Sequence, residues 1–549
     1  MFNDHRLSWD TPDNPGAVAP AGTSNVIGPF VANRRSAGDD RRPWHVVLGL
    51  ILPMTLLIWN MLRVRSFTID DAYISYRYAR NFARGLGLVY NPGEHIEGYT
   101  NFLWTVVLGA GMRLNLDPEA LAKILGGLAS CGSLYVVFLL SRRLRPYTVM
   151  PCVATWLMAT SIVQSGYAVF GLETSAFTFF VLAGCELFFR ERDRPAAMPY
   201  SGLMFGLAGL TRPEAPMFIG ILMLFLGRRL FDRQNLLRGV LFAAPIAVHL
   251  LWRHSYYDAW LPNTLAAKTG SLGQQLRGGS DYLGQYLRHT WPVWLLALIG
   301  VGVAQGVTAL SLMALALAVL MYVLLVGGDW MPYFRFLGPF EPFFFLFACL
   351  GIRAGGETVL SALTRLPQQV SGPRRRALAV SLGVVAIVAL ASIGYFRADR
   401  LTAAQQKILT DDKVFWDSAA GRVAQWLVIN DQPGEIAVAD IGYIGYATDY
   451  PLLDLLGLVD PVIAKLPGGY TRKYGPGYVE RVFDKEPRYF VFVGGAGTCS
   501  QLPFPAQEKL RRDERFQSNY KLVQAIAHSK GGVWCIFERR GAGARVTAG

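Results

Sequence analysis

Long apolar runs, separated by short basic clusters, are the feature of this 549-residue sequence that most limits how it folds. Hydrophobic residues make up 52% of the chain and charged residues only 17%, whereas about 25% charged is usual for soluble proteins. Runs of this length match helices that cross the hydrocarbon core of a bilayer. The sequence therefore predicts a polytopic α-helical membrane protein. The net charge of +14 does not indicate nucleic-acid binding, because the basic residues form no face with interleaved aromatic residues.

The basic clusters predict how the chain is oriented in an inner or plasma membrane. Four arginines between residues 34 and 42 precede the first apolar run, so the N-terminus is expected in the cytoplasm. We expect about eleven spans, at residues 46–63, 121–141, 147–164, 174–190, 198–211, 214–228, 237–252, 291–305, 307–326, 337–353 and 377–395. An odd number of spans places the region after the last one outside the cytoplasm.

Three regions follow from this pattern. Residues 1–44 are rich in Pro, Gly, Asp and Arg and are expected to form a disordered cytoplasmic tail. Residues 45–395 form the expected transmembrane domain, with a first external loop at residues 64–120. Residues 396–549 are expected to form an external soluble domain of mixed α/β structure, because short runs of β-forming residues alternate there with helical patterns.

Two cysteines of this C-terminal region, Cys499 and Cys535, have no spacing typical of a zinc site. If the region is outside the cytoplasm, they can form a disulfide bond. Spacing alone does not fix the pairing, so two free buried thiols are the alternative.

The first external loop contains two adjacent carboxylates, Asp70 and Asp71, at the start of a helical pattern. Apolar residues recur every four residues along this pattern, and such an amphipathic helix is expected to lie along the membrane surface. A carboxylate pair at that place can act as a catalytic base or as a cation site. A structural interpretation is also open, because Thr68 and Asp71 approximate a capping box at the helix start.

Other polar residues are unusual in so apolar a chain, and the expected topology places all of them on the same external side. They are Glu173, Arg212, Glu214, Asn263, Lys268, Asp329, Trp330 and Arg335. Ionisable groups near membrane depth are costly, so they mark either a water-filled site or a paired structural contact. The structural alternatives are a helix cap, ion pairs among these residues themselves, and contact with lipid headgroups. Independent structural uses would be spread over both sides, so the clustering favours a shared site.

The combined groups suit a substrate that has a phosphate, a hydrophobic tail and a sugar. Arginine binds phosphate with paired hydrogen bonds. Tyr73, Tyr76, Tyr99 and Trp330 offer flat faces for a sugar ring or a lipid chain. A carboxylate can take a proton from an acceptor hydroxyl while a new glycosidic bond forms.

Several stretches form a pattern that extends over about residues 46–470. They are residues 70–97 of the first loop, Gly171–Thr174, Leu210–Glu214, Pro262–Asn263 with Lys268, Gly327–Trp330 with Arg335, and Asp454–Asp460. This pattern resembles the membrane-embedded GT-C glycosyltransferases and, more narrowly, the bacterial arabinofuranosyltransferases of the AftB type.

The resemblance implies a polyprenyl-phosphate-linked sugar donor and an inverting single displacement with an aspartate base. It makes Asp70 the expected base and Asp71 the residue that orients or caps. It implies donor binding by Arg77, Glu173, Arg212, Glu214, Asn263, Lys268, Asp329, Trp330 and Arg335, and acceptor binding by Tyr73, Glu97 and Tyr99. For the AftB type, the donor is decaprenyl-phosphoryl-arabinofuranose and the acceptor is a terminal arabinofuranose of arabinogalactan or lipoarabinomannan. The new linkage is β-1,2.

Other functions stay open at this point. The chain after about residue 470 matches no part of the family pattern, so transfer of another sugar to a protein or lipid acceptor is an alternative. A transporter of lipid-linked sugar is disfavoured, because the sequence shows no repeated halves with charges at the midplane of both. A binding or assembly protein would leave the same-side cluster unexplained. A divalent cation (Mg, Mn or Ca) is a possible cofactor, but no spacing of carboxylates requires one.

Overall fold

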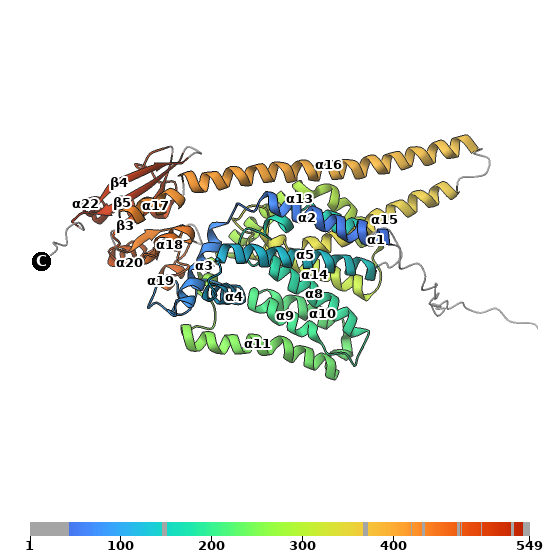
Figure 1. Cartoon of the computed structure of the whole chain (residues 1–549), viewed down its shortest axis with the longest axis horizontal. Coiled ribbons are helices and arrows are strands. Elements are labelled where there is room, and N and C mark those ends of the chain that lie inside the picture. Colours follow the sequence, from blue (N-terminus) through green and yellow to red (C-terminus); the bar gives the residue numbers. More distant parts are fainter. Residues whose placement is uncertain are drawn as a thin grey trace, which may run out of the picture. The chain divides into compact units, whose positions relative to one another are not determined.

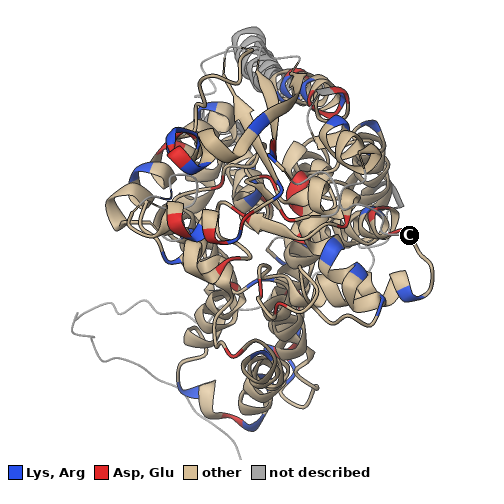
Figure 2. Cartoon of the chain, turned by 90° about the vertical axis from the view of Figure 1, so that its left-hand side faces the viewer, with Lys and Arg blue, Asp and Glu red and all other residues tan. Residues whose placement is uncertain are grey.

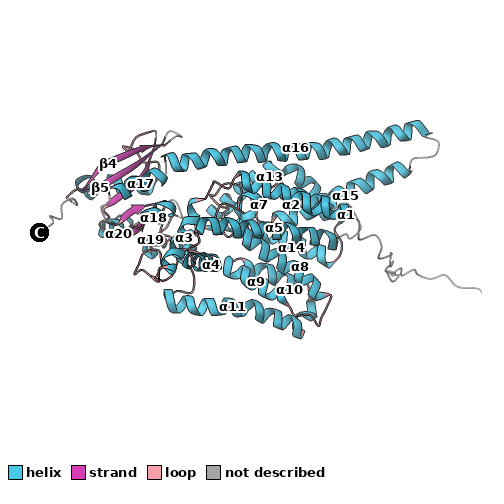
Figure 3. Ribbon diagram, in the orientation of Figure 1, coloured by secondary structure: helices cyan, strands magenta, loops and turns pink. Residues whose placement is uncertain are grey.

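The computed structural model describes residues 43–144, 151–268, 270–365, 372–418, 420–430, 434–468, 473, 475–495, 497–528 and 532–541. Nearly all of the expected disordered tail at residues 1–44 lies outside these described residues. The described chain is mostly helical, and its strands all belong to the C-terminal part (Figures 1 and 3).

Helices occur at every position where a span is expected. They are α1 (Pro43–Val46), the π-helical turn η1 (Val47–Ile51) and α2 (Leu52–Arg63), then α5 (Pro118–Leu144), α6 (Pro151–Ala159), α8 (Thr174–Arg192), α9 (Tyr200–Thr211), α10 (Ala215–Leu224), α11 (Arg233–Tyr257), α13 (Leu272–Val303), α14 (Val307–Val326), α15 (Glu341–Arg365) and α16 (Gly372–Ser418). Among the described residues, α5, α11 and α14 are both long enough and apolar enough to cross a membrane. The polytopic helical class is thus supported, and the number of eleven spans stays a prediction.

Two spans differ in detail from the expectation. The third expected span is interrupted after Ala159. A separate helix, α7 (Ile162–Gly166), begins directly after Ser161, whose hydroxyl accepts hydrogen bonds from the N–H groups of Val163 and Gln164. A serine at this position satisfies the free amides of a new helix and so favours the break. The last span continues as one helix to Ser418, so the domain boundary expected at residue 395 falls inside α16.

The C-terminal part is built on a five-stranded sheet with the strand order β2-β1-β3-β5-β4. The strands are β1 (Ile436–Val438), β2 (Leu452–Asp454), β3 (Tyr489–Gly494), β4 (Tyr520–Ala527) and β5 (Val533–Arg539). Strand β1 pairs in parallel with β2 and β3, and its residues are all buried, as expected for a short apolar run between two neighbours. Strand β5 is antiparallel to both β3 and β4.

Six helices accompany this sheet. They are α17 (Ala420–Ile429), α18 (Gly442–Thr448), α19 (Pro461–Ala464), α20 (Tyr478–Asp484), α21 (Pro505–Arg512) and α22 (Glu514–Asn519). The expected mixed α/β structure is therefore present in the described residues. The disulfide bond between Cys499 and Cys535 is present too, and it joins the chain after β3 to β5.

The helix that starts at the two aspartates, α3 (Asp70–Ala83), is buried within the protein. Its expected place along a membrane surface stays a prediction. It packs against α4 (Phe102–Arg113) on one side and against α18 of the C-terminal part on another. Every residue from Ala72 to Ala79 is buried. Its polar side chains have partners from distant parts of the chain, which is what makes this burial possible.

Arg77 is the strongest of these polar contacts. Its side chain is fully buried, and its guanidinium donates to the backbone oxygens of Tyr90 (2.9 Å), Gly445 (2.6 Å) and Tyr450 (2.7 Å) and to Oδ1 of Asn91 (3.3 Å). The guanidinium thereby joins α3, the first loop and the C-terminal part. All of its groups are used within the protein, so the predicted role of Arg77 in donor binding is wrong.

Figure 2 shows acidic and basic residues interspersed on the end of the molecule that carries the C-terminal part. Arg80 of α3 and Arg84 directly after it, for example, both contact Asp449, at 2.7 and 2.5 Å.

We expect Arg77→Lys to lower the free energy of unfolding by about 2–4 kcal/mol, because a single ammonium cannot reach all four acceptors and leaves buried oxygens unpaired. Thermal unfolding of the detergent-solubilised protein measures this change. Arg84→Lys is the matched control, since this half-exposed side chain makes one ion pair and its loss costs less than about 1 kcal/mol. Equal melting temperatures for the two variants would contradict the role assigned to Arg77.

Candidate active site

Asp70, in the first turn of α3, holds the C-terminal part in place. Its carboxylate accepts hydrogen bonds from the backbone N–H groups of Gly442 (3.1 Å) and Tyr443 (2.8 Å), at the start of α18. Gly442 must lack a side chain, because a Cβ there would overlap Asp70. Burial raises the pKa of Asp70 to about 7, the charges of Asp440 and Asp71 act in the same direction, and the two N–H groups act against them.

Asp71 is in a different situation from its neighbour. Its carboxylate makes no hydrogen bond or ion pair to any residue that the structure describes. Burial raises its pKa, while the positive charges of Lys268 and Arg335 lower it. The negative charges of Asp329 and Glu173 are also close enough to act on it. Asp71 is thus an unpaired carboxylate among charged groups from three other parts of the chain.

The capping box expected from Thr68 and Asp71 is not formed at the start of α3. No side chain caps the start of α3, and the residue before Asp70 has extended backbone. Thr68 donates instead to Glu119 at 2.7 Å. Neither carboxylate is therefore consumed by its own helix, and Asp71 rather than Asp70 has oxygens free for a ligand. The geometry therefore favours Asp71 as the base, whereas the sequence favoured Asp70.

The buried arginines near Asp71 are paired with carboxylates. Arg212 contacts Glu173 at 3.0 Å and Glu214 at 2.6 Å, and Arg335 contacts Asp329 at 2.6 Å. The alternative of mutual pairing is therefore confirmed for these residues. The pairing does not separate them from the site, because the charges of Glu173, Asp329 and Arg335 all act on Asp71.

The segment that carries Asp329 and Arg335 has an unusual backbone. Gly327, Gly328, Tyr333 and Phe334 all have positive φ angles, between 58° and 92°. Glycine adopts such angles freely, but two successive bulky aromatic residues do so only when their surroundings impose it. This strained turn leads into η3 (Arg335–Leu337) and fixes Arg335 beside Asp329. Strain of this kind concentrates at functional sites. Trp330 in the same turn is more than half exposed.

Lys268 ends the short helix α12 (Asn263–Lys268) and has an exposed side chain. Asn263 holds the start of this helix, because its amide donates to the backbone oxygens of Gly457 (2.8 Å) and Leu458 (2.9 Å). The predicted donor contact of Asn263 is therefore replaced by a structural one. Among the charges that act on Asp71, that of Lys268 lowers its pKa the most.

The three residues expected to bind the acceptor are buried, and the structure contradicts that role. Tyr73 donates to Glu119 at 2.8 Å, and Glu97 forms a 2.7 Å ion pair with Arg253. The hydroxyl of Tyr99 lies 3.1 Å from that of Tyr257. A loop open to solvent would leave these side chains accessible. The loop is instead folded into the protein, and its polar groups find internal partners.

Asp440 belongs to the site and was missed in the sequence. It follows β1 and precedes α18, and burial followed by the charge of Asp71 raises its pKa to about 6. A carboxylate at the carboxyl end of a parallel strand is a familiar position for a functional group, and that signal was available in the sequence. Within the described residues, no group of three or more His, Cys, Asp or Glu side chains is arranged to hold a metal ion.

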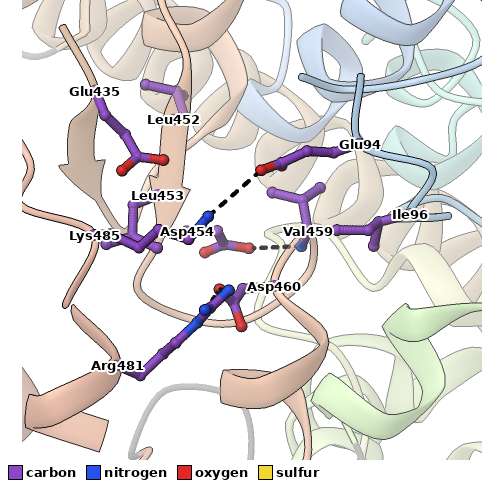
Figure 4. Close-up of a pocket in the computed structure, with 10 residues that line it drawn as sticks. All are labelled: Glu94, Ile96, Glu435, Leu452, Leu453, Asp454, Val459, Asp460, Arg481 and Lys485. Atoms are coloured by element: carbon purple, nitrogen blue, oxygen red, sulfur yellow. Dashed lines mark hydrogen bonds and ion pairs between the residues drawn. The ribbon is translucent and has the colours of Figure 1, made fainter. Parts of the chain in front are cut away.

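A second polar recess lies where the first loop meets the C-terminal part (Figure 4). Its two basic side chains each meet a carboxylate: Arg481 contacts Asp460 at 2.8 Å, and Lys485 lies 3.6 Å from Glu94. Asp454 accepts from the N–H groups of Leu456 and Val459 and so closes its own loop. The Asp454–Asp460 stretch of the family pattern is thus a structural element in this chain.

Comparisons with known proteins show which proteins this chain is similar to. A family model described as a domain of unknown function (DUF8728) matches residues 408–547, which include the whole sheet. The terminal β-(1→2)-arabinofuranosyltransferase of Mycobacterium tuberculosis is 28% identical over 262 residues, which are 43% of this chain and 40% of that protein. The enzyme of the same name from Corynebacterium glutamicum is 26% identical over 321 residues, 49% of this chain and 45% of that protein. The match thus spans less than half the length of these relatives.

The fold is also similar to a solved structure. ArnT from Cupriavidus metallidurans, bound to undecaprenyl phosphate, superposes with a TM-score of 0.55 at 12% identity, over 90% of this chain and 98% of that chain. This likeness shows the GT-C fold of a membrane protein. The resemblance stated from the sequence, to GT-C proteins and to arabinofuranosyltransferases among them, is confirmed.

The raised pKa of Asp70 predicts a pH-dependent stability. The folded protein binds the Asp70 proton more tightly than the unfolded chain, whose aspartates have the ordinary pKa of 3.8. The resulting stabilisation is complete below pH 4 and is lost as the pH rises through 7. We therefore expect the melting temperature of the wild type to fall between pH 5 and pH 8 more steeply than that of Asp70→Asn. Thermal unfolding at several pH values measures both slopes. Asp281→Asn, at an exposed position of α13, should keep the wild-type slope, and a wild-type slope in Asp70→Asn would refute the prediction.

Proposed function

We propose that this protein is a membrane glycosyltransferase that moves a sugar from a polyprenyl-phosphate donor to a glycan of the cell envelope. The observation that carries the proposal is the unpaired carboxylate of Asp71 within reach of the charges of Lys268 and Arg335. A carboxylate that can take a proton, beside cations that can hold a phosphate, is the minimum that such a transfer requires.

Asp71 acts as the general base in this proposal. It removes the proton from an acceptor hydroxyl, and the oxygen forms a bond to the anomeric carbon of the donor sugar. The bond from that carbon to the phosphate oxygen breaks, and the lipid phosphate leaves with both electrons of that bond. A single displacement of this kind inverts the anomeric configuration. Burial strengthens Asp71 as a base, because it raises the pKa of the carboxyl.

Lys268 and Arg335 stabilise the leaving phosphate. The negative charge on the phosphate grows as the glycosidic bond breaks, so nearby fixed cations lower the barrier. Lys268 is the more exposed of the two, since the side chain of Arg335 is buried. Arg212, held by two carboxylates, supports the position of Glu173 rather than meeting the donor itself.

The sugar is arabinofuranose in this proposal, and the product is a β-1,2 linkage to a terminal arabinofuranose of arabinogalactan or lipoarabinomannan. The names of both curated relatives support this choice. The donor is decaprenyl-phosphoryl-arabinofuranose, and the lipid phosphate bound to the ArnT structure supports a donor of that chemical kind. A divalent cation remains a possible cofactor, and no step of the mechanism uses one.

The site and the C-terminal part face the outside of the cell in this proposal. The disulfide bond between Cys499 and Cys535 supports that orientation, because such bonds persist in oxidising compartments. The cytoplasmic N-terminus inferred from the basic residues is consistent with it.

We expect Asp71→Asn to reduce kcat by about 10³-fold or more, because removal of a general base typically costs 10²–10⁴-fold. Asp70→Asn should retain more activity, since Asp70 holds α18 and is not available to the acceptor. Transfer from synthetic decaprenyl-phosphoryl-arabinofuranose to a short arabinan measures both, with and without a chelator. Loss of activity with the chelator would establish a cation. Full activity of Asp71→Asn would rule out its role as the base, and no product from the wild type would rule out the donor–acceptor pair.

We expect Lys268→Gln to raise the KM for the lipid donor about tenfold, which corresponds to about 1.4 kcal/mol, while the KM for the acceptor stays unchanged. The loss of one cation that meets the phosphate explains this effect. Lys413→Gln is the matched control, because Lys413 is an exposed lysine on α16 whose only described ion pair is a 3.8 Å contact with Asp417. Equal KM values for the donor in both variants would contradict the proposed contact.

A further inference from the structure

Three hydrogen bonds fix the connection between β1 and α18, two of them to α3 and one to the first loop. Asp70 accepts hydrogen bonds from Gly442 and Tyr443, and the hydroxyl of Tyr90 donates to the backbone oxygen of Ile441 at 2.5 Å. Asp440 directly precedes these residues. Consecutive Cα atoms are about 3.8 Å apart, so the Cα of Asp440 lies within about 7 Å of that of Gly442, which contacts the start of α3, and the charge of Asp71 acts on Asp440.

Asp440 and Asp71 share an unusual property. Neither carboxylate has a hydrogen bond or an ion pair to any residue in the described part of the chain. The other carboxylates near them, Asp70, Glu173 and Asp329, have such partners. Asp440 is also exposed to solvent, although burial of part of its surroundings raises its pKa. Two unpaired carboxylates therefore meet at a place that a soluble ligand can reach.

The charges around this pair are distributed unevenly. Lys268 and Arg335 act on Asp71, whereas the only charge that shifts the pKa of Asp440 is that of Asp71. Asp70, which lies beside both, is occupied by the N–H groups of α18. Asp71 thus stands between a positively charged side, which suits a phosphate, and Asp440, which suits a donor of hydrogen bonds.

We propose that Asp440 is a second carboxylate of the active centre, which binds the acceptor sugar through the hydroxyl next to the one that Asp71 deprotonates. This inference rests on the proposed function. A sugar with two neighbouring hydroxyls offers two O–H donors at the spacing of adjacent carbons, and two unpaired carboxylates accept them. Asp440 takes no proton in the reaction. It is a positioning residue that aligns the attacking oxygen with Asp71 and gives the C-terminal part a share in the acceptor site.

A first experiment tests the pair without any substrate. A water-soluble carbodiimide with an amine nucleophile labels protonated carboxyl groups, and mass spectrometry of the Asp440 peptide follows the labelling against pH. The groups that face Asp440 are Asp70 and Asp71 on α3, and beyond them Lys268, Arg335, Asp329 and Glu173. We expect half-labelling near pH 6 in the wild type and at a lower pH in Asp71→Asn, because the charge of Asp71 is gone. The same pH of half-labelling in both proteins would show that Asp71 does not act on Asp440 and would overturn the proposed pair.

A second experiment tests the acceptor role by transfer to a short arabinan. We expect Asp440→Asn to raise the KM for the arabinan about tenfold or more, with little change in the KM for the lipid donor. The KM for the arabinan should also rise below about pH 6 in the wild type, where Asp440 becomes protonated, and stay flat in Asp440→Asn. A merely structural residue would not remove this pH dependence. Asp440→Glu keeps the charge and should restore most of the affinity.

A control variant separates the effect of losing the Asp440 carboxylate from the effect of weakening the contact between the C-terminal part and α3. Asp449→Asn breaks the exposed ion pairs with Arg80 and Arg84 but leaves Asp440 in place, so its KM for the arabinan should change less than twofold. An unchanged KM for the arabinan in Asp440→Asn would overturn the acceptor role. If the wild type transfers nothing, the proposed function fails and the acceptor role with it, whereas the labelling experiment still decides whether the pair exists.

Discussion

The burial of α3 between the membrane helices and the C-terminal part is the constraint on which the site depends. An amphipathic helix with two arginines, Arg77 and Arg80, can be buried only if most of its polar groups find partners. Arg77 meets this requirement with acceptors from the first loop and from residues more than 360 positions away in the sequence. Those contacts fix α18 on α3, and α18 in turn determines where Asp440 stands. The chemistry at Asp71 therefore depends on an arginine that takes no part in it.

The two adjacent aspartates show how one helix end serves two purposes. Neighbouring residues of an α-helix point about 100° apart, since 3.6 residues complete a turn. One carboxylate consequently faces α18 and holds the domain, while the other faces Lys268 and Arg335. Neutralising either aspartate would affect activity, but for different reasons: the first through docking and the second through proton transfer. The backbone hydrogen bonds to α18 belong to Asp70 alone, whereas both carboxyls have raised pKa values and both therefore make stability depend on pH.

Much of the fold could be predicted from the sequence, because hydropathy and basic clusters are local signals. The positions of the helices and the mixed C-terminal part follow from such signals. The roles of single polar residues do not, since they depend on partners elsewhere in the chain. Glu97 looks accessible in the sequence, yet Arg253 neutralises it in the structure. Asp440 was missed for the converse reason: nothing near it in the sequence shows that β1 ends beside α3.

The division of the site between two parts of the chain has a consequence for specificity. The groups proposed to meet the lipid phosphate, Lys268 and Arg335, belong to the region that resembles the known transferases. The proposed acceptor contact, Asp440, lies in that region too, but also within residues 408–547, which match a separate family model of unknown function. Donor chemistry is the same for any acceptor, whereas acceptor recognition must differ from one glycan to another. A chain that keeps the first set and varies the loop between β1 and α18 can change its acceptor without altering how the donor is activated.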